Sequence, residues 1–115
     1  MLNVSHNGLH NLPSYLKGLS ALTALNASHN KINFWPGWLK ELPGVAVLDL
    51  SHNSVRTIPV GFDEAAVRDL NLSNNLLKLL PPILGNMKSL LVLVCGCWCG
   101  SGSENGDQVE WVCRM

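Results

Sequence analysis

The stretch Leu48-Asp49-Leu50-Ser51-His52-Asn53-Ser54-Val55 decides the fold of this chain, because the chain repeats it. Similar octapeptides begin at Leu2 (LNVSHNGL), Leu25 (LNASHNKI) and Leu70 (LNLSNNLL). The asparagine at the sixth position therefore recurs every 22 or 23 residues. Self-similarity at such a period indicates a solenoid, in which each repeat forms one coil and packs only against its neighbours.

The remainder of each period keeps the same spacing. An aliphatic residue follows each asparagine by two positions, and a proline follows it by six. At these positions the chain resembles the leucine-rich repeat family, whose pattern is L-x-x-L-x-L-x-x-N-x-L. The proline after the asparagine and the period near 23 look most similar to the intracellular, Ras-group-related branch of that family. The resemblance covers residues 1–94.

The resemblance implies an α/β fold, a leucine-rich repeat solenoid that forms a short horseshoe arc. A parallel concave sheet would line its inner side, and helical or 3₁₀ turns would line its convex side. Residues 1–94 are expected to form this domain, as four repeats and the start of a fifth. Residues 95–115 lose the repeat pattern, and we expect them to form an irregular tail rich in cysteine, glycine and serine.

Three interpretations of the tail cysteines Cys95, Cys97, Cys99 and Cys113 are open. A zinc site is disfavoured by the C-x-C-x-C spacing, since paired ligands in structural zinc sites are usually two to four residues apart. A disulfide-bonded cap, which closes secreted members of the family, would follow an N-P-W-type motif that the tail lacks. The favoured interpretation is an unpatterned tail with reduced thiols.

Side-chain alternation along each predicted strand turns the leucines inward and the residues between them outward. The asparagine at the end of each unit is expected to turn inward, where its amide can bond backbone groups of the bend. One such asparagine in every coil would bind each coil to the next. We therefore predict a structural ladder of Asn7, Asn30, Asn53 and Asn75.

The outward residues form columns across the concave face, which we predict to be the protein-binding surface. The predicted contact residues are Asn26, Ser28, His29, Val47, Asp49, Ser51, His52, Asp69, Asn71 and Ser73. His6, His29 and His52 could stack, because neighbouring strands lie about 4.8 Å apart. A metal site or a pH switch in this column is possible. Solvated histidines are favoured over a metal site, since no carboxylate or thiolate joins the column, and we assign no metal ligand.

Composition limits the classes of function. The formal net charge is zero and charged residues make up 14% of the chain, so no basic field exists to bind nucleic acid or an anionic membrane. The longest apolar run is too short to span a bilayer. The sequence contains no phosphate-binding loop and no paired nucleophile and base. We therefore expect no catalytic residue, no enzymatic activity and no cofactor.

These observations favour a non-catalytic scaffold that recognises a partner protein through its concave face, in intracellular signalling in the cytoplasm. The resemblance suggests a small GTPase or another signalling protein as the partner. The alternative is a fragment of a larger signalling enzyme, such as a GTPase, kinase or cyclase, because no polar cap precedes the apolar residues after Met1. A metal- or redox-responsive protein is a third hypothesis.

Overall fold

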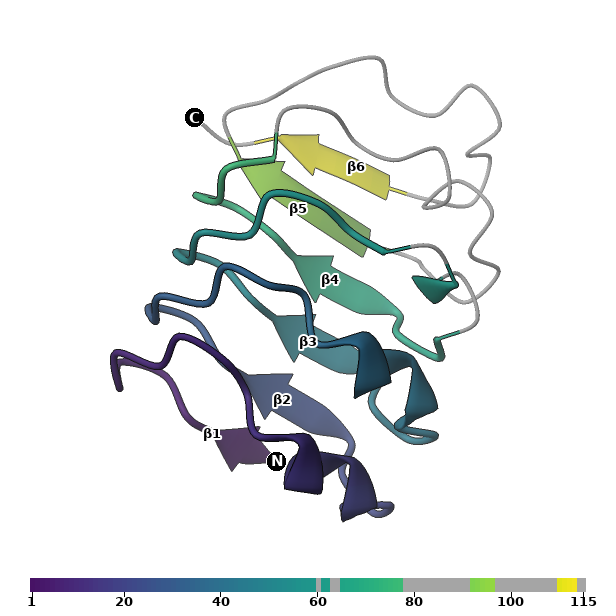
Figure 1. The fold of residues 1–115 in the computed structure, drawn as a ribbon. Helices are drawn as coiled ribbons and strands as arrows, with labels where there is room; N and C mark the ends of the chain where they lie inside the picture. The colour runs from purple at the N-terminus through teal and green to yellow at the C-terminus, as the bar shows by residue number, and fades with distance from the viewer. Residues whose placement is uncertain (60, 63–64, 78–91, 97–109, 114–115) are drawn as a thin grey trace.

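The computed structural model describes residues 1–59, 61–62, 65–77, 92–96 and 110–113. Six strands in these ranges form one sheet, and each strand is parallel to its neighbours (Figure 1). The order of the strands in the sheet follows their order in the chain, so every coil adds its strand beside the preceding one. This is the solenoid with a parallel sheet that the sequence predicts.

The strands are short, and their register follows the sequence repeat. Their bounds are β1 (Leu2–Asn3), β2 (Ala24–Asn26), β3 (Val47–Asp49), β4 (Asp69–Asn71), β5 (Val92–Gly96) and β6 (Glu110–Cys113). Leu25 pairs with Leu2 on one side and with Leu48 on the other. Equivalent residues of successive repeats therefore lie side by side, which is what creates columns on the face of the sheet.

On the other side of the core, the described residues include two 3₁₀ helices, η1 (Ser14–Gly18) and η2 (Gly37–Glu41). Pro13 and Pro36 are their N-caps, at the entry to the turn where the sequence places these prolines. Proline suits the start of a helix because its fixed φ is helical and the first N–H groups have no helical partner. Within the described residues, no helix is long and apolar enough to cross a membrane.

The core lies between the sheet and the 3₁₀ turns. Its largest fully buried side chains are Phe62, Leu25, Ile32, Leu39, Leu42, Leu48, Leu50, Leu70 and Leu72. Phe62 meets Trp35 edge to face, with ring centroids 4.7 Å apart and ring planes at 77°. Such an aromatic pair contributes about 0.5–1.5 kcal/mol beyond the burial of its surface.

The tail contains a strand, which corrects the expectation that all of residues 95–115 are irregular. Strand β5 includes Cys95 and Gly96, and β6 pairs with it in parallel, with Leu93 opposite Trp111. Aromatic and β-branched residues favour a strand at Glu110–Cys113. The repeat pattern missed β6 because that strand lacks the asparagine motif that marks the other coils.

Candidate functional site

Three of the ladder asparagines, Asn30, Asn53 and Asn75, join their own bend to the preceding coil. The Asn53 Oδ1 atom accepts the N–H of Ile32 at 3.0 Å. Its Nδ2 atom lies 3.0 Å from three carbonyl oxygens, that of Ala27 in the preceding coil and those of Leu50 and Ser51 in its own coil. Asn53 is 8% exposed, so these bonds satisfy backbone groups that water reaches poorly.

The same bonding recurs at the other ladder positions. The Asn30 Oδ1 atom accepts the N–H groups of Asn7 and Leu9, at 2.9 and 3.0 Å. The Asn75 Oδ1 atom accepts the N–H of Val55 at 3.0 Å. Asn7, in the first coil, is exposed, and its Nδ2 donates to carbonyl groups of its own bend. The predicted ladder residues thus lie in one row and connect successive coils.

The serine column is buried, which corrects its predicted place on the binding surface. Ser28, Ser51 and Ser73 are only 5, 5 and 8% exposed. The hydroxyl and the N–H of Ser51 both donate to Asp49 Oδ1, at 2.6 and 2.9 Å. Alternation fails at these positions because each strand ends two residues earlier, as β3 does at Asp49. The serines therefore stabilise the backbone just after each strand, and their buried side chains are not accessible to a partner.

The residues that accept hydrogen bonds from the serines, Asn26, Asp49 and Asn71, are half-buried. Asn26 and Asn71 accept bonds from Ser28 and Ser73 as Asp49 does from Ser51. In all three residues the Oδ1 atom accepts both bonds. In the described part of the chain, the second carboxylate oxygen of Asp49 and the amide nitrogens of Asn26 and Asn71 have no hydrogen-bond partner. These atoms are the part of the column that a partner could bind.

The histidines stack along the sheet, at the distance that the strand spacing predicts. The ring centroids of His6 and His29 are 4.3 Å apart, and those of His29 and His52 are 4.1 Å apart. The ring planes in the two pairs differ by only 9° and 11°. Asn74 continues the column, and its Nδ2 lies 3.2 Å from Nε2 of His52. For the Asn74 amide to donate in this contact, His52 takes the tautomer in which Nε2 is the acceptor.

Backbone geometry explains which residue types occupy this column. His6, His29, His52 and Asn74 have positive φ angles of 59, 57, 56 and 58°. Asparagine and histidine are among the few residues other than glycine that are enriched in this left-handed region. Sequence reasoning missed this constraint. The recurrence of only histidine and asparagine before the ladder asparagine was the available signal.

The pKa of His29 is lowered from its ordinary value. Desolvation is the largest cause, repulsion from His52 and His6 follows, and the Asp49 carboxylate acts in the opposite direction. His29 is exposed as a residue, but one ring stacks on each of its faces, and these rings exclude water there. The stack therefore favours the neutral form of the central imidazole.

The stack does not have the geometry of a metal site. An ion bound to imidazole lies close to the ring plane, about 2.0–2.1 Å from the nitrogen for zinc. Nearly parallel rings more than 4 Å apart direct their lone pairs along lines that do not converge. Among the described residues, no group of three or more histidine, cysteine, aspartate or glutamate side chains could hold a metal ion. Cys97 and Cys99 lie outside the described residues.

Adding zinc is therefore expected to leave the melting temperature of the chain unchanged. Adding a chelator or a reductant should also leave it unchanged. A metal that binds the native state raises the melting temperature by mass action. Circular dichroism melts with and without each additive measure the effect. A zinc-dependent rise would contradict the expectation. If that rise disappeared in His29→Asn, the ion would be at the stack, and if it survived there, the cysteines would be the next ligands to replace.

The exposed part of the predicted surface is smaller than the sequence suggests. Val47 and Asp69 pair across β3 and β4, and both are exposed, as are His29 and His52. We call the outward side of strands β1 to β4, together with the histidine stack, the sheet face. Sequence reasoning missed Phe34, which is 72% exposed on the flank of its coil.

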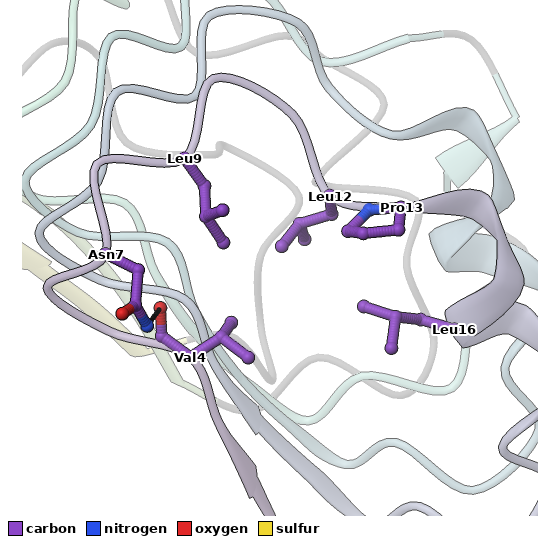
Figure 2. A pocket seen from close by; sticks show the side chains of 6 residues that line it. All are labelled: Val4, Asn7, Leu9, Leu12, Pro13 and Leu16. Carbon is purple, nitrogen blue, oxygen red and sulfur yellow. Dashed lines mark hydrogen bonds between the residues drawn. The ribbon is translucent and has the colours of Figure 1, made fainter.

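A hollow of about 380 Å³ opens beside the first coil (Figure 2). It is lined by Val4, Asn7, Leu9, Leu12, Pro13 and Leu16. Its only side chain with polar atoms is that of Asn7, whose Nδ2 donates to the Val4 carbonyl at 2.9 Å. The remaining residues are the core-facing residues of the first repeat. The hollow is therefore the open end of the stacked core, and it offers no acid, base or nucleophile.

Comparison with known proteins agrees with this geometry. Residues 33–77 match the leucine rich repeat family. A leucine-rich repeat protein of Leptospira interrogans is 31% identical over 81% of this chain and 24% of its own, with a TM-score of 0.75. The functional domain of InlJ from Listeria monocytogenes, described as including a cysteine ladder, is 20% identical over 97% of this chain and 24% of its own, also with a TM-score of 0.75. The chain thus spans about a quarter of the length of these two structures. No curated protein matches it.

Proposed function

Because this chain carries the leucine-rich repeat and its fold, we propose that it is a protein-binding module without catalytic activity, which recognises a partner protein through the sheet face. The observation that supports this most is the fixed geometry of that face. Asp49 is held by Ser51, His29 is held between two rings, and the backbone below them is fixed by the asparagine ladder. Ordered side chains lose little conformational entropy on binding.

The convex side offers a poorer surface. Its exposed cations Lys17 and Lys40 have long side chains, which are costly to immobilise. The exposed side chains of the sheet face, by contrast, are short or held against a neighbour. The contrast favours the sheet face as the contact surface.

The finer proposal is that the module acts in intracellular signalling in the cytoplasm, with a small GTPase or another signalling protein as its partner. It rests on the resemblance of the repeat to the Ras-group-related branch. The two solved structures described above are bacterial leucine-rich repeat proteins and do not favour that branch over others. Locating the tagged protein in its own cells tests the proposal, and a location outside the cytoplasm would contradict it.

A second candidate is that the module serves as the recognition part of a larger protein, such as a GTPase, kinase or cyclase. The observation in its favour is the length of the matched structures, of which this chain spans about a quarter. Sequencing the transcript beyond both ends of the chain tests it. An enzymatic domain in the same reading frame would support it, and a reading frame limited to repeats would contradict it.

The Val47→Arg/Asp69→Arg variant is expected to lose at least tenfold in affinity for a partner captured from cell extract. Both residues are exposed on neighbouring strands, so long charged side chains there would block the sheet face without filling the core. A tenfold loss corresponds to about 1.4 kcal/mol. Affinity is measured by titrating the purified partner, identified by mass spectrometry, with each variant.

The matched control is Leu19→Arg/Glu41→Arg. Leu19 and Val47 are both 43% exposed, and each variant adds the same charge, but Leu19 and Glu41 lie on the 3₁₀ side. The control variant should bind with unchanged affinity. The opposite result, with loss only in the control, would move the contact surface to the convex side and overturn the proposal.

A further inference from the structure

The histidine stack brings three titratable side chains into contact on the sheet face. The rings of His6, His29 and His52 lie face to face, with centroids 4.1–4.3 Å apart. This geometry suits neutral rings, because aromatic faces attract when they are offset and uncharged. Two like charges 4 Å apart repel even in bulk water, and they repel more strongly where the rings exclude water.

His29 is the ring on which this repulsion acts most. Both of its neighbours in the stack are histidines, and among the residues that the structure describes, Asp49 carries the one carboxylate that acts on it. One oxygen of Asp49 already accepts two bonds from Ser51, which limits how far that carboxylate can turn toward the ring. The balance of these groups favours the neutral form of His29.

The far end of the stack also favours a neutral ring. The Asn74 amide donates to Nε2 of His52 at 3.2 Å, and a proton on that nitrogen would remove the acceptor. Protonation would therefore break this bond in its present form, and the Asn74 amide would have to turn its Oδ1 toward the ring to replace it. His52 and His29 are thus linked through one continuous row of side chains.

We propose that the stack of His6, His29 and His52 is a proton-operated switch on the sheet face, stacked while its rings are neutral and separated when they are protonated in mildly acidic solution. Its role in partner binding rests on the function proposed above. Separation replaces a flat uncharged strip with mobile cationic side chains. A partner that binds the flat strip is released by acid.

Protonation of His29 is expected to lower the free energy of unfolding. The folded chain holds His29 with a lowered pKa, whereas the unfolded chain has the ordinary histidine value of about 6.5. Below that pH the unfolded chain binds more protons, so this residue lowers the free energy of unfolding as pH falls through the folded pKa of His29. The contribution of His29 is fully favourable above about pH 6.5.

The test is an NMR titration of the free chain from about pH 8 to about pH 5, which spans the histidine range. In the wild-type chain we expect contacts between protons of neighbouring rings at high pH and their loss as His29 is protonated. The pKa of His29 should rise in His6→Asn and in His52→Asn, because each variant removes one repelling neighbour. Asparagine fits the backbone at both positions, since Asn74 has the same positive φ in the next coil.

His10→Asn is the matched control, because His10 is exposed and is not part of the stack. It should leave the titration of His29 unchanged. The proposal is overturned if the pKa of His29 is the same in all four proteins, or if ring contacts persist after protonation. Both measurements use the free chain, so a failure here is distinguishable from the absence of a binding partner.

Discussion

Phe62→Ala is expected to lower the free energy of unfolding by about 3–5 kcal/mol, the usual cost of truncating a buried phenylalanine. Phe62 is only 1% exposed and fills the core beside Trp35, so alanine would leave a cavity against an aromatic ring. Each coil of a solenoid contacts only its neighbours, so few other contacts can compensate. Urea denaturation followed by circular dichroism measures the loss.

The chain contains its own control for this experiment. Phe34, the only other phenylalanine, is 72% exposed. Phe34→Ala should change the free energy of unfolding by no more than about 0.5 kcal/mol, as surface substitutions generally do. Equal losses in the two variants would show that Phe62 does not pack in the core as described.

Asn53→Leu is expected to lower the free energy of unfolding by about 1–3 kcal/mol. Leucine has a similar volume, but it would leave the Ile32 N–H without its partner. It would also remove one of the two side-chain donors to the Ala27 carbonyl, which would keep only its bond from Asn30. Each buried polar group that loses its bond costs about 1–3 kcal/mol. The loss should therefore exceed that of a single exposed hydrogen bond.

Asn33→Leu is the comparison for this substitution, because Asn33 is exposed and outside the ladder. It should melt close to the wild-type chain, whereas Asn53→Leu should melt well below it. Similar melting temperatures in the two variants would contradict the view that the ladder holds the coils together.

The sequence predicted the fold in most respects, because the same pattern of residues recurs in every coil. A residue such as Leu48 recurs at the same place in each copy, so its inward position is clear without any knowledge of its neighbours. The prediction failed where the chain stops repeating. Strand β6 adds to the sheet through backbone pairing with β5, and backbone pairing leaves no motif in the sequence.

The candidate surface was less predictable than the fold. Ser51 looks like an outward residue by alternation, yet it is buried because its strand has already ended. The stack of His29 on its neighbours followed from strand spacing alone. The lowered pKa of His29 did not, because it depends on both ring faces being covered at once.

The positive φ angle shared by His6, His29, His52 and Asn74 has a consequence for how this surface can change over time. Few side chains tolerate that backbone, and asparagine and histidine both do. Their codons differ by a single nucleotide, so one mutation exchanges an uncharged amide for a titratable ring without disturbing the coil. Asn74→His would lengthen the stack by one ring, and each His→Asn change would shorten it. The number of rings, and with it the response to acid, is therefore a trait that selection can adjust one coil at a time.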